Sequence, residues 1–485
     1  MNTNLLDRQL ARAPLALVLA GLLAGPAAPS IVAATTAAAS GKSPSAVAST
    51  IVVTNCDDAG PGSVRTAFLA AVDGTTIDLS QLACSTITLT TGALIDQGGA
   101  VQSGPGGVRI RGNKQTIDAH GLSRVLVHNG SNRLVLEGVE LTNGRYSGIY
   151  GGGCVYSYGD VLLQRATVES CNMYGLYDGP ARGGAIYSHG EVSLFDNSAI
   201  RASTASAIHY GSAEGGGVWA RNVRLDRSVI SANNAIGKLT ASRGGGVFAT
   251  DPNGNFPALD MDYSTLSANY AVIGGGGYAD GDAQVAYSTI ASNVALGNGA
   301  GLFVLQKPTT GTQTSIAAST ISGNFATVDG GGLFLDAAAT LKNCTVTDNI
   351  GFHSGGGIFL KRTHTIENSI VALNIAEEVS SSDDIGGSAV IDGHANIVIS
   401  SKVVLPEDTL AADPKLAPLA DNGGRTLTHA LLPDSPAIDH GTAGNSQYYW
   451  DQRGAGYERT AGAQSDIGAY ERQDRLFANG FEPEA

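Results

Sequence analysis

A short motif that occurs eight times along the middle of the chain constrains the fold more than any other feature. Each copy has two or three small residues, mostly glycine, followed in most copies by an aliphatic residue and then by an aromatic one. The aromatic residues are Tyr156, Tyr187, Trp219, Phe248, Tyr278, Phe303, Phe334 and Phe359, and they lie 31, 32, 29, 30, 25, 31 and 25 residues apart. Such a period indicates a solenoid, in which each repeat packs on the next.

A second motif alternates with the first and consists of an aliphatic residue, two further residues and an asparagine. The asparagines are Asn233, Asn269, Asn293, Asn324, Asn349 and Asn374. In the two earliest repeats Cys171 and Ser203 occupy the asparagine position. Two motifs that keep one common period are not expected of a flexible glycine-rich linker.

The residue types distinguish between the known classes of repeat protein. Helical repeats need good helix formers and apolar residues at a spacing of 3.6, whereas these repeats are rich in Gly, Ser, Thr and Asn. Propeller blades need about 40 residues or more. A coil of three short strands and three turns fits the period. We therefore predict an all-β fold, a right-handed parallel β-helix with a short N-terminal capping helix.

Stacked coils place matching side chains about 4.8 Å apart, so that equivalent residues form rows along the axis. We expect aliphatic residues to fill the interior and the asparagines to stack at a tight turn, where Asn tolerates a left-handed φ. We expect the glycines to mark a crowded bend. The aromatic residues should point inward or lie at the corner; the alternative is an exposed row on which sugars stack.

The ends of the chain differ from the repeats. Arg8 and Arg12 precede an apolar run over 13–24 and then small residues, which predicts a signal peptide cleaved between Ala28 and Ala39. No other stretch approaches 18 apolar residues, so we expect no transmembrane span in the mature chain. The formal charge of −14 argues against nucleic acid and anionic membranes as partners.

We divide the chain into five segments. They are a signal peptide with a spacer (1–38), an N-terminal cap with the first coils (50–100), the β-helix coils (101–400), a C-terminal module (401–472) and a tail (473–485). The coils from about Thr76 to Tyr150 lack the motif and should be irregular. Residues 63–72 should form the capping helix, with Ser63 as its N-cap and Val64, Phe68 and Val72 on one face.

The five cysteines of an exported chain leave at least one unpaired. Cys56 and Cys84 flank the cap segment and are expected to form a disulfide. Cys154 and Cys171 both fall at corners of one repeat, and a second disulfide forms there only if their Cα atoms lie within about 7 Å. Cys344 is left over and is expected to be a buried thiol; the alternative is a bridge between two chains.

Two segments resemble known families. The repeats, best at Gly183-Gly184-Ala185-Ile186, resemble those of polymorphic outer-membrane proteins, although aliphatic residues stand where that family often has Phe. The C-terminal module resembles a choice-of-anchor Q module in Asp421-Asn422-Gly423-Gly424, Leu427-Thr428-His429-Ala430-Leu431, Ser435-Pro436-Ala437-Ile438-Asp439, Asp451-Gln452-Arg453-Gly454 and Asp466-Ile467-Gly468-Ala469-Tyr470-Glu471. The segment Phe477-Ala478-Asn479-Gly480-Phe481-Glu482 resembles a tail of exported Gram-negative proteins. The resemblances imply a protein that is secreted or displayed on the surface of a Gram-negative cell, and no reaction.

Few residues suggest chemistry. Asp383-Asp384 is interpreted as a solvated loop pair and Asp57-Asp58 as part of the cap. Asp251, Asn253, Asn255 and Asp262 resemble a calcium loop, but Phe256 stands where Gly is required; Asp280 and Asp282 are a weaker alternative. In the C-terminal module Asp439, Asp451, Arg453 and Asp466 are expected to form structural ion pairs. The nine histidines form no His-x-x-x-His pair. We assign no catalytic residue, cofactor or metal ligand.

Two functions remain open. The first is a non-catalytic, adhesin-like protein that binds a glycan or a protein. The alternative is a lyase or glycoside hydrolase that acts on an acidic polysaccharide. The fold by itself is not evidence for either of these two functions. An autotransporter passenger is disfavoured because no run of alternating strands could form its barrel. An enzyme predicts carboxylates together with Arg or Lys in a groove on one strand face.

Overall fold

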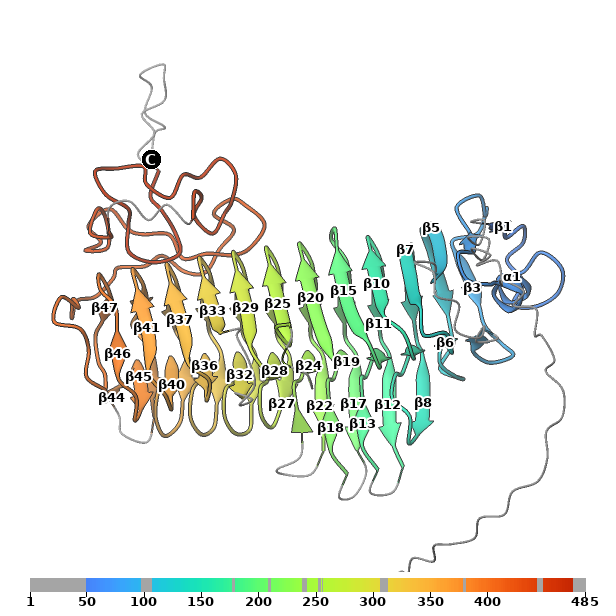
Figure 1. Cartoon of the computed structure of the whole chain (residues 1–485), viewed down its shortest axis with the longest axis horizontal. Helices are drawn as coiled ribbons and strands as arrows, with labels where there is room; N and C mark the ends of the chain where they lie inside the picture. Colours follow the sequence, from blue (N-terminus) through green and yellow to red (C-terminus); the bar gives the residue numbers. More distant parts are fainter. Residues whose placement is uncertain are drawn as a thin grey trace, which may run out of the picture. The chain divides into compact units, whose positions relative to one another are not determined.

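The computed structural model describes residues 49–473 except 97–106, 177–178, 208–210, 238–241, 252–253, 255, 306–312, 378–380 and 443–447. The predicted signal peptide and nearly all of the predicted tail lie outside the described residues. The described part is a parallel β-helix of about 11 turns (Figure 1). None of its helical structure is long and apolar enough to cross a membrane.

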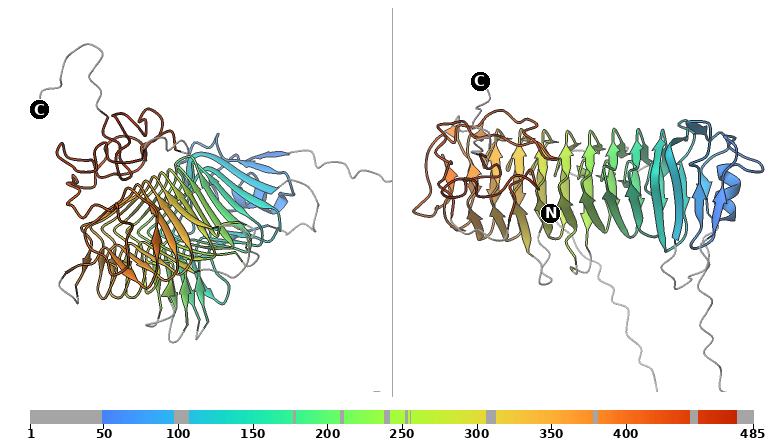
Figure 2. Two further views of the ribbon diagram at one scale, coloured as in Figure 1. Left: turned by 60° about the vertical axis from the view of Figure 1, so that its left-hand side comes forward. Right: turned by 90° about the horizontal axis from the view of Figure 1, so that it is seen from above.

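Each regular coil contains four short strands rather than the three expected. The chain runs through two consecutive strands of sheet A, turns into sheet C and then enters sheet B. In three coils a further strand, in sheet D, precedes sheet B. The strands pair in parallel with those of the next coil, as Figure 2 shows, except for the antiparallel pair β43–β44.

The elements have the following bounds. In sheet A the first strand of each coil is β10 (Val161–Gln164), β15 (Glu191–Phe195), β20 (Asn222–Asp226), β25 (Leu259–Asp262), β29 (Ala283–Ala286), β33 (Thr314–Ala317), β37 (Ala339–Lys342), β41 (His364–Glu367) and β46 (Ile391–Asp392). The second is β11 (Thr167–Glu169), β16 (Ala199–Arg201), β21 (Val229–Ser231), β26 (Thr265–Ser267), β30 (Thr289–Ala291), β34 (Thr320–Ser322), β38 (Thr345–Thr347), β42 (Ile370–Val371) and β47 (Ile397–Val398). The first coils contribute β1 (Thr50–Val52), β2 (Thr76–Asp78), β3 (Thr86–Thr88), β5 (Gly107–Asp118) and β7 (Arg133–Thr142).

Sheet C contains β8 (Arg145–Gly148), β12 (Asn172–Gly175), β17 (Thr204–Ala207), β22 (Asn234–Ile236), β27 (Tyr270–Ala271), β31 (Val294–Ala295), β35 (Phe325–Ala326), β39 (Ile350–Gly351), β43 (Ile375–Ala376) and β44 (Ser381–Ser382). Sheet D contains β13 (Ala181–Arg182), β18 (Ala213–Glu214) and β23 (Ser242–Arg243). Sheet B contains β4 (Leu94–Ile95), β6 (Leu126–His128), β9 (Val155–Ser157), β14 (Ile186–Ser188), β19 (Val218–Ala220), β24 (Val247–Thr250), β28 (Gly277–Asp280), β32 (Leu302–Leu305), β36 (Leu333–Leu335), β40 (Ile358–Leu360) and β45 (Ile385–Gly387).

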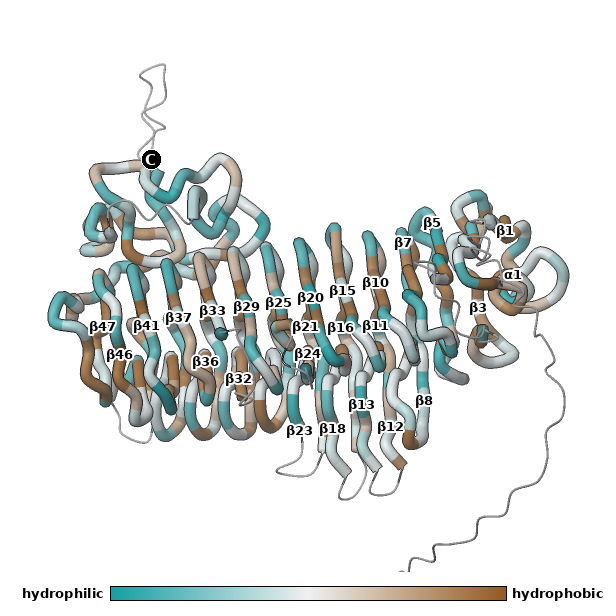
Figure 3. Tube along the Cα trace, in the orientation of Figure 1, coloured by the Kyte–Doolittle hydropathy of each residue, from teal (hydrophilic) through white to brown (hydrophobic). Residues whose placement is uncertain are grey.

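Alternation along each strand builds the central core. In β20, for example, Val223 and Leu225 are buried, whereas Arg224 and Asp226 between and beyond them face outward. The buried residues of successive coils form one continuous cluster along the solenoid. Figure 3 shows hydrophobic segments recurring on the strands of successive coils. The stacking of matching residues follows from the parallel register.

The predicted asparagine row is present at the corner between sheets A and C. The Nδ2 group of each asparagine donates to Oδ1 of the next, at 3.1, 3.0, 3.0, 2.9 and 2.9 Å from Asn233 to Asn374. All six side chains are buried. The row ends on Asp384, whose Oδ1 accepts from Nδ2 of Asn374 at 3.0 Å. The buried amide groups at this corner therefore satisfy one another's hydrogen bonds.

The prediction that asparagine itself adopts the left-handed φ was wrong by one residue. The preceding residue takes that conformation, as in Ala232 (φ 55°) and Leu373 (φ 63°). The turn therefore bends at an exposed position, where side chains of several types occur, and leaves the asparagine pointing into the corner.

A second row, which the sequence analysis missed, lies at the corner between the two strands of sheet A. Its members lie five residues before each asparagine and before Ser203, which takes the asparagine position in its repeat. They are Ser198, Ser228, Ser264, Ser288, Ser319, Cys344 and Ser369. The Oγ of Ser264, for example, accepts from the backbone N–H of Ser228 and donates to the carbonyl of Asp262. Cys344 takes a serine position and is buried and unpaired, as predicted. Burial raises the pKa of its thiol to about 12, so the thiol is inert.

The aromatic residues also form a row, but outside the central core. The aliphatic residue that precedes seven of the eight rings points inward, and Gly277 stands at this position before Tyr278. The eight rings stack on one another with centroids 4.6–6.1 Å apart and interplanar angles of 3–15°. Tyr187, Trp219 and Phe248 lie in register. Each ring is covered mainly by its neighbours in the row. The prediction that the rings lie at the corner is therefore correct, and the prediction that they point into the central core is wrong.

The glycines before the rings mark the crowded bend that the sequence predicts. Gly183 has a φ of 62°. A Cβ on Gly184 would lie 1.9 Å from the carbonyl oxygen of Gly216 in the next coil. Side chains larger than hydrogen are thus excluded.

The N-terminal cap forms α1 (Val64–Ala70), with Ser63 accepting from the N–H of Thr66. Val64 and Phe68 are buried, but Val72 is 65% exposed because the helix ends before it; the prediction for Val72 was wrong. Disulfides join Cys56 to Cys84 and Cys154 to Cys171. The Cα atoms of the second pair are 5.4 Å apart, within the required limit.

Replacing one rung of the asparagine row should be costly. In Asn233→Ala the N–H of Ser203 loses its acceptor and Oδ1 of Asn269 loses a donor. We expect a loss of about 2–3 kcal/mol in the free energy of unfolding, measured in urea. The matched control is Asn234→Ala, at the neighbouring position, which is not fully buried. Equal destabilisation by the two substitutions would contradict a stabilising role for the row.

Candidate functional site

Charged side chains gather on the outward face of sheet A, on the neighbouring strands β20 and β25. Arg224 pairs in register with Asp260, and Asp226 with Asp262. Because parallel strands lie about 4.8 Å apart, these four side chains form a compact square. The next strand, β29, adds Gln284 beside Asp260.

Two arginines, Arg224 of the square and Arg227 from the following corner, contact carboxylates here. Nε of Arg224 lies 3.5 Å from Asp260. Nη2 of Arg227, from the following corner, lies 3.0 Å from Asp226 and 2.8 Å from Asp196. The arginine side chains are 56% and 38% exposed, so their N–H groups remain accessible to a ligand.

Three tyrosines lie beside the charged strands, and two of them, Tyr263 and Tyr448, line cavities there. The rings of Tyr263 and Tyr287, at successive corners, stack at 4.6 Å. Tyr448 of the C-terminal module contacts Tyr287 edge-on at 6.1 Å. Tyr448, Asp260, Asp262 and Gln284 line a cavity of about 360 Å³ with Arg224 and Ser315. The module therefore overhangs the charged strands.

A second cavity, of about 660 Å³, continues beside the first. Its lining includes Arg227, Tyr263, Arg425 and Arg453 together with glycines of two module loops. The two cavities are lined by the consecutive residues Asp262 and Tyr263. We call them together the overhang cleft.

Burial raises the pKa values of two carboxyl groups that line the cleft. Burial raises the pKa of Asp262 to about 6, and the charges of Asp226 and Asp260 add to the shift. Burial also raises the pKa of Asp260, opposed by Arg224. A carboxyl group whose pKa lies near 6 can donate a proton as a general acid.

The C-terminal module is held over the cleft by hydrogen bonds to sheet A. Gln452 reaches the carbonyl of Ser288 and the hydroxyls of Thr289 and Thr320. The imidazole of His429 contacts the hydroxyl of Ser322 at 2.9 Å. The outward faces of β30, β34 and β38 are thereby buried, which fixes the position of the overhang.

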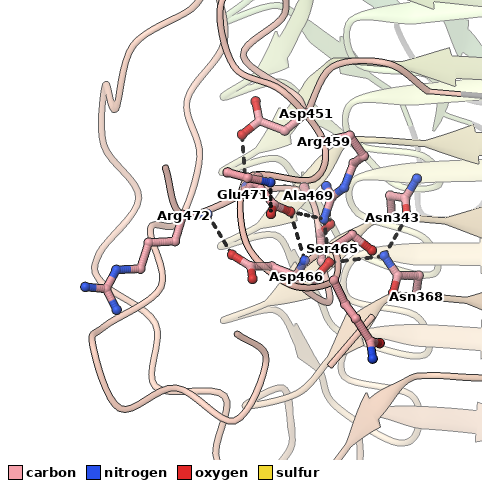
Figure 4. Close-up of polar contacts among 12 residues, drawn as sticks. Asn343, Asn368, Asp451, Arg459, Ser465, Asp466, Ala469, Glu471 and Arg472 are labelled. Atoms are coloured by element: carbon pink, nitrogen blue, oxygen red, sulfur yellow. Dashed lines mark hydrogen bonds and ion pairs between the residues drawn. The ribbon is translucent and has the colours of Figure 1, made fainter. Parts of the chain in front are cut away.

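Inside the module a buried ionic network fixes the loops (Figure 4). Arg453 makes a forked ion pair with Asp451 and lies between the rings of Tyr457 and Tyr470, 4.0 and 3.9 Å from their centroids. The Asp451 carboxylate also accepts from the N–H of Glu471.

The rest of the network surrounds Glu471 and Asp466. Arg459 lies 3.3 Å from Glu471, whose carboxylate accepts from the N–H of Asp466. Asp466 accepts from the N–H groups of Asp439 and Arg472. Burial raises the pKa of Glu471 to about 7, opposed by Arg459. The four module residues singled out from the sequence thus lie in one structural network.

The pair Asp383-Asp384 is not the solvated loop pair that the sequence suggested, because both side chains are buried. Asp384 ends the asparagine row, and Asp383 accepts from the N–H of Gly355 and pairs with Lys402 at 2.9 Å. Asp58 accepts from Thr91 and Arg65 in the cap, and these hydrogen bonds lower its pKa to about 2 against the effect of burial.

The calcium hypotheses receive no geometric support from the described residues. Asp262 lines the overhang cleft, and Asn253 and Asn255 lie outside the described residues. Asp280 accepts from Thr250 and Asp282 from Thr314. Across the described ranges no three Asp, Glu, His or Cys side chains are arranged to hold a metal ion.

One feature of the sequence, the position of residues relative to the corner serines, does mark the charged face of the cleft. Outward positions on the first sheet A strand lie two and four residues before each corner serine, as Asp262 and Asp260 do before Ser264. Only the serine row reveals this register, and only docking of the module reveals which of these positions are covered.

Loss of one network partner should loosen the module. Asp451→Ala leaves the buried guanidinium of Arg453 without its counter-ion, and we expect the free energy of unfolding of the module to fall by about 3–5 kcal/mol. Limited proteolysis and urea unfolding measure this. Asp434→Ala, which removes the exposed partner of Lys415, is the control in the same module and should change neither readout.

Asp262→Asn should stabilise the protein at neutral pH only. The native carboxyl binds its proton more tightly than the unfolded one, so stability falls as pH rises from about 4 to 6 and stays reduced above this window. The asparagine variant should therefore have the higher Tm at pH 7.5 and an unchanged Tm near pH 3.5. Asp392→Asn, at an exposed position, is the control; the same gain there would contradict the assignment.

No protein-family model and no curated protein matches the chain. Among solved structures the chain is similar to a pectate lyase, Pel9A, at 13% sequence identity and a TM-score of 0.37. The match covers 87% of this chain and 97% of the pectate lyase chain. A likeness at this level supports no statement about activity.

Proposed function

We propose that the protein is an exported glycan-binding β-helix protein and that the overhang cleft binds the sugar chain. The observation that carries the proposal is that Arg224, Asp260 and Gln284 line the cleft together with Tyr448 of the module. Asp226 lies on the same strand face, in register beside Asp262. Carboxylates accept from sugar hydroxyls, guanidinium groups donate to them, and an amide does both. Tyr448 adds an aromatic surface against which the apolar face of a sugar ring can pack.

The long solenoid suits an extended ligand. The cleft opens on sheet A, whose outward residues repeat at the strand spacing, so a polymer can contact several coils. The two disulfides and the predicted signal peptide support export to an oxidising compartment. A surface-displayed, adhesin-like role is the form of this function that the sequence resemblances favour.

A glycoside hydrolase is the second candidate function, and the carboxyl groups of Asp226 and Asp262 favour it. They lie on adjacent strands in register, and retaining hydrolases place two carboxyl groups about 5–5.5 Å apart. Asp262, with its pKa of about 6, would donate the proton to the leaving oxygen. Asp226 would attack the anomeric carbon, and water would then release the sugar from that ester.

Binding to a glycan array, followed by calorimetry with the best ligand, tests the proposal. We expect Asp260→Ala to weaken binding at least tenfold because hydroxyl acceptors are lost at the centre of the cleft. Thr365→Ala, in the same outward row four strands further along, is the matched control and should bind normally. Wild-type affinity in Asp260→Ala would overturn the assignment of the cleft.

Release of reducing sugar from the bound glycan separates the two candidate functions. A hydrolase should lose this activity in both Asp262→Asn and Asp226→Asn while each variant still binds. Absence of release by the wild-type protein would leave binding as the function.

A further inference from the structure

The aromatic row ends abruptly in the last coils. Phe359 stacks on Phe334 at 5.0 Å, but its partner in the following coil is Gly386. Each inner ring of the row is stacked on both faces, whereas Phe359 has an aromatic neighbour on one face only. A side chain on Gly386 would collide with Oγ of Ser354 and the backbone of Gly355, so the row ends at Phe359.

A cavity of about 650 Å³ lies at this end of the row. Its lining comprises Phe359 together with Asp336, Ser354, Lys361, Arg362, Gly387, Ser388 and Lys402. We call it the end pocket. It lies on sheet B, and it shares no lining residue with the overhang cleft on sheet A.

The end pocket is cationic although the chain carries a net charge of −14. Lys361, Arg362 and Lys402 face one lining carboxylate, that of Asp336. Lys361 and Arg362 each lie 3.8 Å from it, too far for a strong ion pair. The side chains of the three cations are 45–52% exposed.

Two of the cations are held in place by the fold. Lys402 pairs with the buried carboxylate of Asp383 at 2.9 Å, and Ser354 donates to the same oxygen. Nε of Arg362 donates to the carbonyl of Asp336 at 2.7 Å. Their positions are thus set before a ligand arrives, which lowers the entropic cost of binding.

We propose that the end pocket binds an acidic sugar residue, a ring that carries a carboxylate or sulfate group. The apolar face of the sugar packs against the part of the Phe359 ring that lines the pocket, as sugar faces pack on aromatic surfaces. The anionic group then lies among Lys361, Arg362 and Lys402, where charge-assisted hydrogen bonds form. The pocket selects acidic glycans independently of the overhang cleft.

Calorimetry with the full chain tests this proposal. The probes are an oligogalacturonate, a sulfated oligosaccharide and a neutral oligosaccharide of equal length. We expect the acidic probes to bind and the neutral one to bind at least tenfold more weakly, with affinity falling as salt rises. The double variant K361A/R362A should lose at least tenfold in affinity for the acidic probes, and Phe359→Leu, which removes the flat ring, should also weaken binding.

Arg133→Ala, an exposed cation far along the solenoid, is the matched control and should bind the acidic probes normally. The exposed positions of Lys361 and Arg362 make misfolding a minor concern, and an unchanged Tm confirms the fold. Equal affinity for neutral and acidic probes, or wild-type affinity in K361A/R362A, would overturn the proposal. Asp260→Ala should leave end-pocket binding intact, so failure of one site is distinguishable from failure of the other.

Discussion

The parallel stacking of coils at the strand spacing is the constraint on which the rest of the structure depends. It forces each residue to lie beside its counterpart in the next coil. A residue type therefore suits a position only if two such side chains can pack directly against each other. Aliphatic residues do so by packing, Asn233 and its counterparts by donating amide to amide, and the rings by stacking. Charged residues do so poorly, and this explains why like charges in register, such as Asp226 and Asp262, are informative about function.

The sequence predicted the parts of the fold that this repetition controls. The rows of asparagines and rings could be recognised because their residue types are rare at other positions of the repeat. The serine row escaped notice because serine is common throughout the chain and signals a corner only weakly. The left-handed residue was misplaced by one because Asn is only one of several residue types that adopt this conformation, and here an exposed neighbour does.

The overhang cleft could not be predicted in the same way. It depends on contacts between residues that are far apart in the sequence, such as Gln452 with Ser288 and Thr289. No short sequence pattern predicts that the turn-rich module packs on the second strands of sheet A. The same holds for Asp383, whose burial follows from where the last coil brings Lys402.

The asparagine row has a direction. Every Nδ2 group donates one N–H to the next amide toward the C-terminal end, and the last of these is received by the carboxylate of Asp384. Nδ2 also donates to a backbone carbonyl of the preceding coil, as Asn233 does to Ile200. Aligned amide dipoles place their positive end at this carboxylate, much as a helix N-terminus does for an anion. Because each interior asparagine makes the same hydrogen bonds, insertion or deletion of a whole coil in the middle of the array leaves this hydrogen-bonding pattern unchanged. The coil that contains Asp384 is different, because its carboxylate accepts from the last amide of the row.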